Sequence, residues 1–208
     1  MNDQQSDLRH LDTLDRDLDR FSSLGSATNI IARPMVGLGI SFVFVVVAGI
    51  ASMLFFGSEN NTIIVVAAAC LGAYMALNIG ANDVANNMGP AVGANALSMG
   101  GAIAIAVLFE SAGALIAGGD VVSTIAKGII APESMGTASV FIWAMMAALL
   151  SAALWVNLAT WIGAPVSTTH SVVGGVMGAG IAAAGFAAVN WPTMGKIAAS
   201  WIISPILG

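Results

Sequence analysis

The chain has 208 residues, of which 58% are hydrophobic and only 8% are charged, and its mean hydropathy is +0.90. Soluble proteins carry about 25% charged residues, so a soluble fold could not bury this much apolar surface and we expect an integral membrane protein. The net charge of −5 argues against a nucleic-acid partner, and the single cysteine, Cys70, excludes an internal disulfide or a cysteine metal cluster.

The chain begins with a polar extension, residues 1–33, which precedes a transmembrane region, residues 34–208. The extension holds six of the eleven acidic residues and four of the six basic ones. Its leucines recur at spacings of three and four, which predicts a short amphipathic helix that is solvated or lies at the membrane interface. Arginines and lysines accumulate on the cytoplasmic side of membrane proteins, so the four arginines before the first span predict a cytoplasmic N-terminus.

Several apolar segments approach the roughly 20 residues that a helix needs to cross the bilayer core. The clearest spans are residues 34–56, 101–119 and 137–158. Residues 172–189 are a further apolar segment, and residues 194–207 begin another. The chain therefore reads as a multi-pass helical protein.

A polar interruption, GANDVANNMGP at residues 80–90, follows the apolar segment 62–79. Its polar side chains, two glycines and a proline predict a broken helix.

A carboxylate at membrane depth is costly unless it is paired, hydrated or coordinated, so Asp83 needs a partner. Helical spacing places Asn86 and Asn87 on the face of Asp83, and Asn82 lies four residues before Asn86. These oxygens suit a small cation such as Na⁺, and a protonatable carboxylate could carry H⁺. The alternative is that the asparagines only join helices, for which one asparagine would suffice.

A second interruption, PVSTTHS at residues 165–171, contains four hydroxyl side chains: Ser167, Thr168, Thr169 and Ser171. Pro165 fits a helix start, and Ser167 or Thr168 fits an N-cap. Free N–H groups, hydroxyl donors and the positive end of the helix dipole would together receive an oxyanion. The alternative is an ordinary capped helix whose hydroxyls bond to carbonyls of the same helix. The segments on either side are full spans or the two arms of a re-entrant hairpin, and the pattern allows both.

Three further features carry less specific signals. Glu110 lies in an apolar span, where it could carry a proton or an ion or could be a satisfied interhelical carboxylic acid. His170 beside Ser167 and Ser171 allows an intramembrane hydrolase, although no nucleophile-elbow motif is present. The spacing of Gly174 and Gly178 predicts close packing of helices.

Two strings, GANDVANNMGPAVGA at residues 80–94 and GAPVSTTHSVVGGVMGAGI at residues 163–181, resemble the signatures of the PiT family of inorganic phosphate transporters. The resemblance covers residues 62–208, and the N-terminal extension with the first span looks like an addition found in some bacterial members. Such proteins are not enzymes but secondary transporters that couple phosphate uptake to Na⁺ or H⁺. The resemblance implies that Asn82, Asp83 and Asn86 serve the coupling cation and that Ser167, Thr168 and Thr169 bind phosphate.

The resemblance also implies the architecture. We expect an all-α membrane protein, a polytopic helical bundle with a broken helix and a re-entrant helical hairpin, in the inner (plasma) membrane of a bacterium. The family carries two copies of each motif as an inverted repeat, whereas these 208 residues hold one copy. We therefore expect one half of an inverted-repeat transporter, completed by a second half or by a second copy of the chain.

The expected partners are inorganic phosphate, a coupling cation and the lipid bilayer, with no cofactor beyond Na⁺ or H⁺. Sulfate and metal-phosphate remain alternative substrates, because sulfate is also a tetrahedral anion. A hydrolase and a non-transporting membrane assembly subunit remain alternatives from other functional classes.

Overall fold

The structure is a computed structural model that describes residues 35–57 and 61–207. The chain divides into two compact units, Met1–Val47 and Ala48–Gly208. The helix Met35–Phe56 begins in the first unit and ends in the second. The amphipathic helix predicted within residues 1–33 lies outside the described residues.

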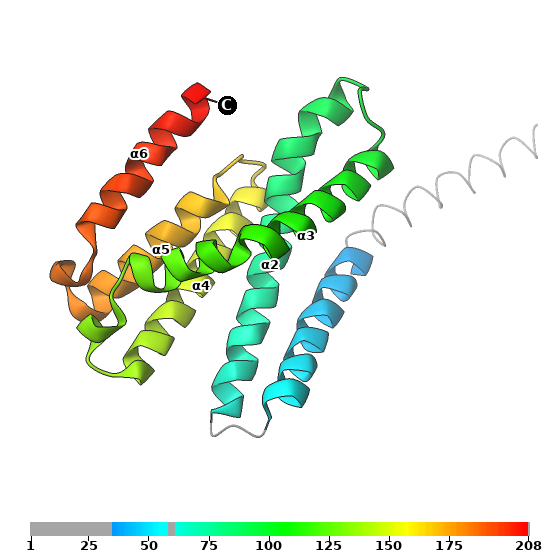
Figure 1. Cartoon of the computed structure of the whole chain (residues 1–208). Coiled ribbons are helices and arrows are strands. Elements are labelled where there is room, and N and C mark those ends of the chain that lie inside the picture. Colours follow the sequence, from blue (N-terminus) through cyan, green and yellow to red (C-terminus); the bar gives the residue numbers. More distant parts are fainter. Residues whose placement is uncertain (1–34, 58–60, 208) are drawn as a thin grey trace, which may run out of the picture. The chain divides into compact units, whose positions relative to one another are not determined.

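The described residues contain four helices that are long and apolar enough to cross a membrane. They are Met35–Phe56, α2 (Thr62–Gly93), α3 (Met99–Ser123) and α4 (Ala138–Trp161). Two shorter helices follow, α5 (Thr168–Ala184) and α6 (Trp191–Leu207), as Figure 1 shows. The described part of the chain has no β-strand, only an isolated bridge between Ile130 and Val189, so the predicted all-α membrane architecture is confirmed.

Helix α2 corrects one expectation, because it continues without a break through residues 80–90. Its 32 residues correspond to about 48 Å at 1.5 Å per residue, more than the roughly 30 Å of a bilayer core. Asn82 bonds Thr160 of α4 and Asp83 bonds Thr168 of α5, so these polar side chains are satisfied while the helix stays closed. Pro90 lies in the last turn, where it has no N–H to donate to the carbonyl of Asn86, so α2 loses one hydrogen bond near its end.

Short helical turns join the longer helices. The end of α3 continues directly into a π-helical turn, Thr124–Gly128, and a 3₁₀ turn, Pro132–Met135, precedes α4. A second 3₁₀ turn, Phe186–Ala188, joins α5 to α6. The π-helical turn thus extends α3 to Gly128, and Ile130 then pairs with Val189.

Helices α4 and α5 form the best-packed pair in the second unit. The face that α4 buries consists of small residues, which let two helix backbones approach closely: Ala144, Ala148, Ala152, Ala153, Val156 and Ala159. The two helices are joined by residues 162–167, so they form a helical hairpin. Whether α5, with 17 residues, is a re-entrant arm or crosses the bilayer stays a prediction.

The glycine of α5 that approaches the backbone of α4 is different from the ones expected. A Cβ added at Gly174 or Gly178 would meet no atom within 4 Å. A Cβ added at Gly175 would lie 2.7 Å from the carbonyl oxygen of Ala148 on α4. The contact face of α5 is therefore one position away from the Gly174 and Gly178 face.

We expect Gly175→Ala to lower the free energy of unfolding by about 1–3 kcal/mol, because the added methyl group overlaps a backbone atom that cannot move alone. Gly178→Ala is the matched control on the same helix and should be neutral or stabilising by up to about 1 kcal/mol, since alanine favours a helix. Thermal or denaturant unfolding in detergent micelles measures both variants. Equal stability of the two would contradict the close packing of α4 against α5.

Candidate functional site

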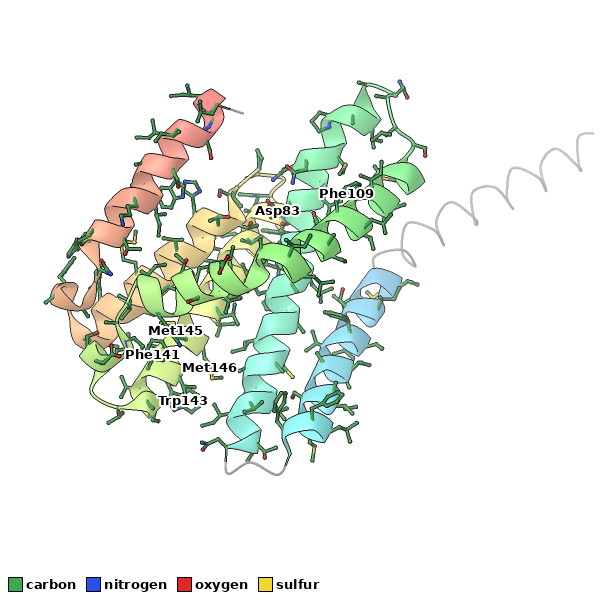
Figure 2. The ribbon with its side chains drawn as sticks, in the orientation of Figure 1. Asp83, Phe109, Phe141, Trp143, Met145 and Met146 are labelled. Atoms are coloured by element: carbon green, nitrogen blue, oxygen red, sulfur yellow. The ribbon has the colours of Figure 1, made fainter. Side chains whose placement is uncertain are left out.

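One hydrogen bond joins the two polar interruptions of the sequence. The hydroxyl of Thr168 donates to Oδ2 of Asp83, at 2.8 Å, across 85 residues of chain. Asp83 lies on α2, and Thr168 is the first residue of α5. Figure 2 shows Asp83 beside the loop that precedes α5. The residue predicted to serve the cation and a residue predicted to serve the anion are therefore in direct contact.

The neighbouring asparagines of α2 face a different helix. Asn82 is buried and donates from Nδ2 to the hydroxyl of Thr160 on α4, at 3.2 Å. Asn86 donates from Nδ2 to Oδ1 of Asn82, at 2.9 Å. Thr160 in turn donates to the carbonyl of Val156 in its own helix. Two adjacent residues of α2 therefore bond two different helices: Asp83 bonds α5, and Asn82 bonds α4.

A second side-chain contact between α2 and α4, a pair of amides, was not predicted from the sequence. Asn157 on α4 donates from Nδ2 to Oδ1 of Asn78 on α2, at 2.9 Å, and Asn78 donates to the carbonyl of Tyr74. Asn78 is only 5% exposed, so its side chain depends on these partners. The sequence does contain a pattern that could have predicted a polar contact at Asn78, because Asn78, Asn82 and Asn86 recur every four residues along one face of α2.

The four hydroxyls of residues 165–171 have separate roles. Ser167 is the N-cap of α5, as expected, and its Oγ accepts a hydrogen bond from the backbone N–H of His170. Ser171 donates to the carbonyl of Ser167 within the helix, which is the ordinary capped-helix arrangement. Thr168 is buried and bonds Asp83, whereas Thr169 is exposed.

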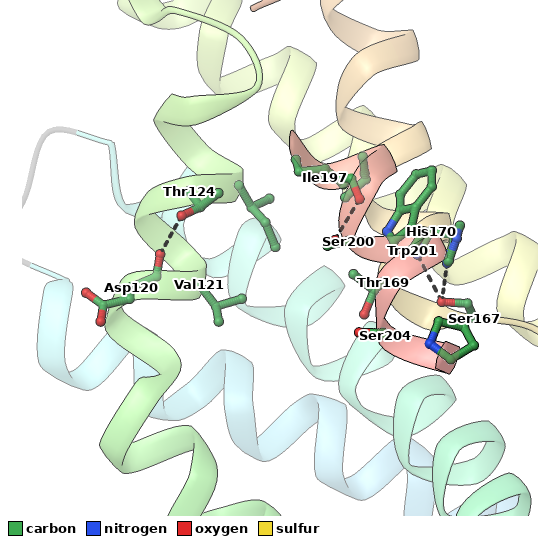
Figure 3. A pocket seen from close by; sticks show the side chains of 13 residues that line it. Asp120, Val121, Thr124, Ser167, Thr169, His170, Ile197, Ser200, Trp201 and Ser204 are labelled. Atoms are coloured by element: carbon green, nitrogen blue, oxygen red, sulfur yellow. Dashed lines mark hydrogen bonds between the residues drawn. The ribbon is translucent and has the colours of Figure 1, made fainter. Parts of the chain in front are cut away.

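Ser167 and Thr169 line a cavity of about 550 Å³ between α3, α5 and α6. The polar side chains of its wall are Asp120, Thr124, Ser167, Thr169, His170, Ser200 and Ser204. The lining contains no lysine or arginine, and Figure 3 shows the Asp120 carboxylate pointing away from the hydroxyl groups of α5 and α6. Ser171 lies instead in a smaller cavity of about 390 Å³, beside Trp155. Apart from Asp120, the polar side chains of the larger cavity are hydroxyl groups and the His170 imidazole.

His170 stands at the edge of both cavities. Its Nδ1 lies within hydrogen-bonding distance of the Ser167 hydroxyl, and its tautomer decides which of the two donates. Its ring stacks on the indole of Trp201 on α6, with centroids 3.8 Å apart and planes inclined by 31°. His170 therefore links the start of α5 to α6.

Two other predicted residues lie apart from this contact. Asn87 is exposed on α2, and Glu110 is exposed on α3. Within the described residues, no hydrogen bond joins either side chain to Asp83 or to Thr168. The structure thus brings together Asn82, Asp83, Asn86 and Thr168, with Ser167 and Thr169 at the adjoining helix start.

Comparisons with known proteins identify relatives of this arrangement. A family model described as "Phosphate transporter family" matches residues 79–208. A Helicobacter pylori protein named "Putative phosphate permease" is 52% identical over 182 residues, which cover 88% of this chain and 34% of that protein. A Thermococcus kodakarensis protein of the same description is 49% identical over 138 residues, covering 66% and 34% of the two chains. The chain spans about a third of the length of these relatives.

A solved structure named "The sodium-dependent phosphate transporter" is also similar. The TM-score is 0.62 at 44% sequence identity, and the match covers 69% of this chain and 36% of the other. The likeness therefore extends to sequence as well as to fold.

We expect Asn157→Leu to lower the free energy of unfolding by about 0.6 kcal/mol, and by at most about 2, because it leaves the buried Asn78 oxygen without its donor. Ser151→Ala on the same helix is the matched control, since the Ser151 hydroxyl bonds only to Ala148 within α4. Unfolding in detergent micelles compares the two. An Asn157→Leu variant no less stable than Ser151→Ala would show that the amide pair does not hold α2 against α4.

Proposed function

Because the chain belongs to the phosphate transporter family, we propose that it forms part of a secondary transporter that moves inorganic phosphate by symport with a cation. The observation that carries the proposal is the hydrogen bond between Thr168 and Asp83, which joins a residue of the proposed anion site to one of the proposed cation site. The chain is an integral membrane protein. We place it in the bacterial inner membrane with its N-terminus in the cytoplasm, following its arginine distribution.

The proposed cation site centres on the Asp83 carboxylate. Thr168 occupies one lone pair of Oδ2, so the remaining carboxylate lone pairs are available. Asn86 uses its Nδ2 group on Asn82, and its Oδ1 accepts no hydrogen bond within the described residues. We propose Na⁺ as the cation because the similar solved structure is named as a sodium-dependent transporter, with H⁺ as the alternative. Asn82 and Asn87 complete the set of candidate oxygen ligands.

The proposed anion site lies at the start of α5. The N–H groups of Thr168 and Thr169, in the first turn, have no partner within a helix, and the helix dipole is positive there. Ser167 and Thr169 line the adjoining cavity, and Ser171 lies about one turn further on. Neutral donors would hold phosphate without the strong attraction of a buried arginine, so that release stays easy.

The cavity wall favours phosphate over sulfate. The Thr124 hydroxyl donates to the carbonyl of Asp120, and the Ser200 hydroxyl donates to the carbonyl of Ile197. An oxygen whose hydrogen is engaged in this way can only accept a further hydrogen bond. Protonated phosphate offers such a hydrogen at neutral pH, and sulfate does not. Sulfate and metal-phosphate are the alternative substrates.

The contact between Ser167 and His170 is the one observation that favours a hydrolase. A histidine that acts as a base needs a third group to orient it, as in the serine hydrolases. Here the His170 ring stacks on Trp201, and no carboxylate bonds it within the described residues. The relatives are named as permeases, so we propose transport rather than catalysis.

We propose that a second repeat, either a second half or a second copy, completes the site. Ser167, Thr169 and Asn86 are exposed in the single repeat, although they belong to a proposed binding site. Carriers built from inverted repeats bind substrate between the repeats and move one against the other. A single repeat would leave the site open on one side.

Asp83→Asn should lower the affinity for radioactive sodium ions at least about tenfold in the purified protein assembled with its second repeat, because the charged ligand is lost. The asparagine oxygen can still accept the Thr168 hydrogen bond, so the fold should persist while the charge is lost. Glu133→Gln, which removes an exposed carboxylate before α4, is the matched control and should bind as the unaltered protein does. Undiminished, saturable sodium binding by Asp83→Asn would remove Asp83 from the cation site.

Liposomes that contain at most one copy of the 208-residue chain should show no phosphate uptake driven by a sodium or proton gradient. Alternating access needs a second repeat, which a lone chain does not supply. Radioactive phosphate inside the liposomes measures uptake, and photobleaching of a labelled chain counts the copies. Gradient-driven uptake by single chains would contradict the requirement for a second repeat.

A further inference from the structure

We propose that the Thr168 hydroxyl is the switch that couples the two sites: it donates to Asp83 when the cation is absent and to phosphate when the cation is bound. This proposal rests on the proposed cation and phosphate sites. It attributes the coupling between cation binding and phosphate binding to the hydroxyl hydrogen of Thr168.

Thr168 has one hydroxyl hydrogen and two possible acceptors for it, which are Oδ2 of Asp83 and an oxygen of the proposed phosphate. That hydrogen is engaged by Oδ2 of Asp83, at 2.8 Å. While it stays there, the hydroxyl can offer an anion only its lone pairs, which repel negative charge. Thr168 is 7% exposed, so water has little access to replace either acceptor. In this arrangement the phosphate site lacks one of its donors.

A cation on Asp83 changes the balance between the two acceptors. The positive charge attracts the carboxylate lone pairs and weakens Asp83 as a hydrogen-bond acceptor. A phosphate oxygen at the start of α5 then becomes the better acceptor, and a charge-assisted hydrogen bond to it is among the stronger kinds. Phosphate that takes the Thr168 hydrogen in turn frees Oδ2 of Asp83 for the cation. Each ion therefore raises the affinity for the other, as linkage requires.

The surrounding contacts make Thr168 different from its neighbours. Ser167 uses its oxygen to cap the helix, and Thr169 faces the cavity, so neither hydroxyl bonds Asp83. Asn82, next to Asp83, holds this part of α2 against Thr160 of α4. Asp83 thus sits on an anchored helix while the Thr168 hydroxyl needs only a rotation about one bond to change partner.

The test compares phosphate affinity in sodium chloride and in choline chloride at equal ionic strength, using radioactive inorganic phosphate and the purified transporter in which this chain is assembled with its second repeat. In the unaltered protein, sodium should increase phosphate affinity. Thr168→Val should lower affinity about tenfold in sodium and leave it nearly unchanged in choline, because without sodium the hydroxyl does not serve phosphate. The sodium enhancement should therefore shrink about tenfold, and Thr168→Ser should restore it.

Thr169→Val is the matched control. Its hydroxyl does not contact Asp83, so the variant should lower phosphate affinity by the same factor in both salts and keep the sodium enhancement. Binding of radioactive sodium without phosphate gives a second readout, which should be as tight or tighter in Thr168→Val because a competing donor to Asp83 is gone. Thr168→Ala serves the same comparison if the valine variant does not fold.

An equal loss of phosphate affinity in both salts for Thr168→Val, or no loss in sodium, would overturn the switch while leaving the phosphate site in place. Failure of the unaltered protein to bind phosphate in either salt would overturn the proposed function itself, and the switch with it.

Discussion

The structure depends on one constraint, which is that polar side chains in apolar helices must find partners on neighbouring helices. The Asp83 carboxylate bonds Thr168 of α5, and the Asn82 amide bonds Thr160 of α4. The same two adjacent residues therefore fix the distance from α2 to both arms of the α4–α5 hairpin. The proposed ion sites and the hydrogen bonds that the fold needs between its helices use the same groups.

This shared use has a consequence for transport. Side chains that bond only to each other stabilise a rigid bundle, whereas side chains that can exchange a partner for an ion permit a change of state. The amide pair between Asn78 and Asn157 is of the first kind, because it joins two helices away from the cavity and from Asp83. In the proposed switch, the bond between Thr168 and Asp83 is of the second kind. The α2–α4 contact would then serve as a frame on which the start of α5 responds to ions.

Much of the fold follows from the sequence, because the length and hydropathy of an apolar segment are sufficient to identify a membrane span. The helices Met35–Phe56, α3 and α4 match the predicted segments closely. The predicted break in α2 was wrong, since local composition shows polar residues but not the partners that satisfy them. Proximity of Asp83 to Thr168 could be anticipated only through the family resemblance. Asn157, Thr160 and Gly175 were missed because each acts through a contact on another helix, which hydropathy does not encode.

The most direct test of this account is a structure of the protein determined with sodium and phosphate and compared with one determined without them. The account predicts tetrahedral density within hydrogen-bonding distance of Thr168 and Thr169, a cation on the Asp83 carboxylate, and a Thr168 hydroxyl that has turned from Asp83 to the phosphate. Phosphate bound away from the start of α5, with the hydrogen bond between Thr168 and Asp83 intact, would contradict it.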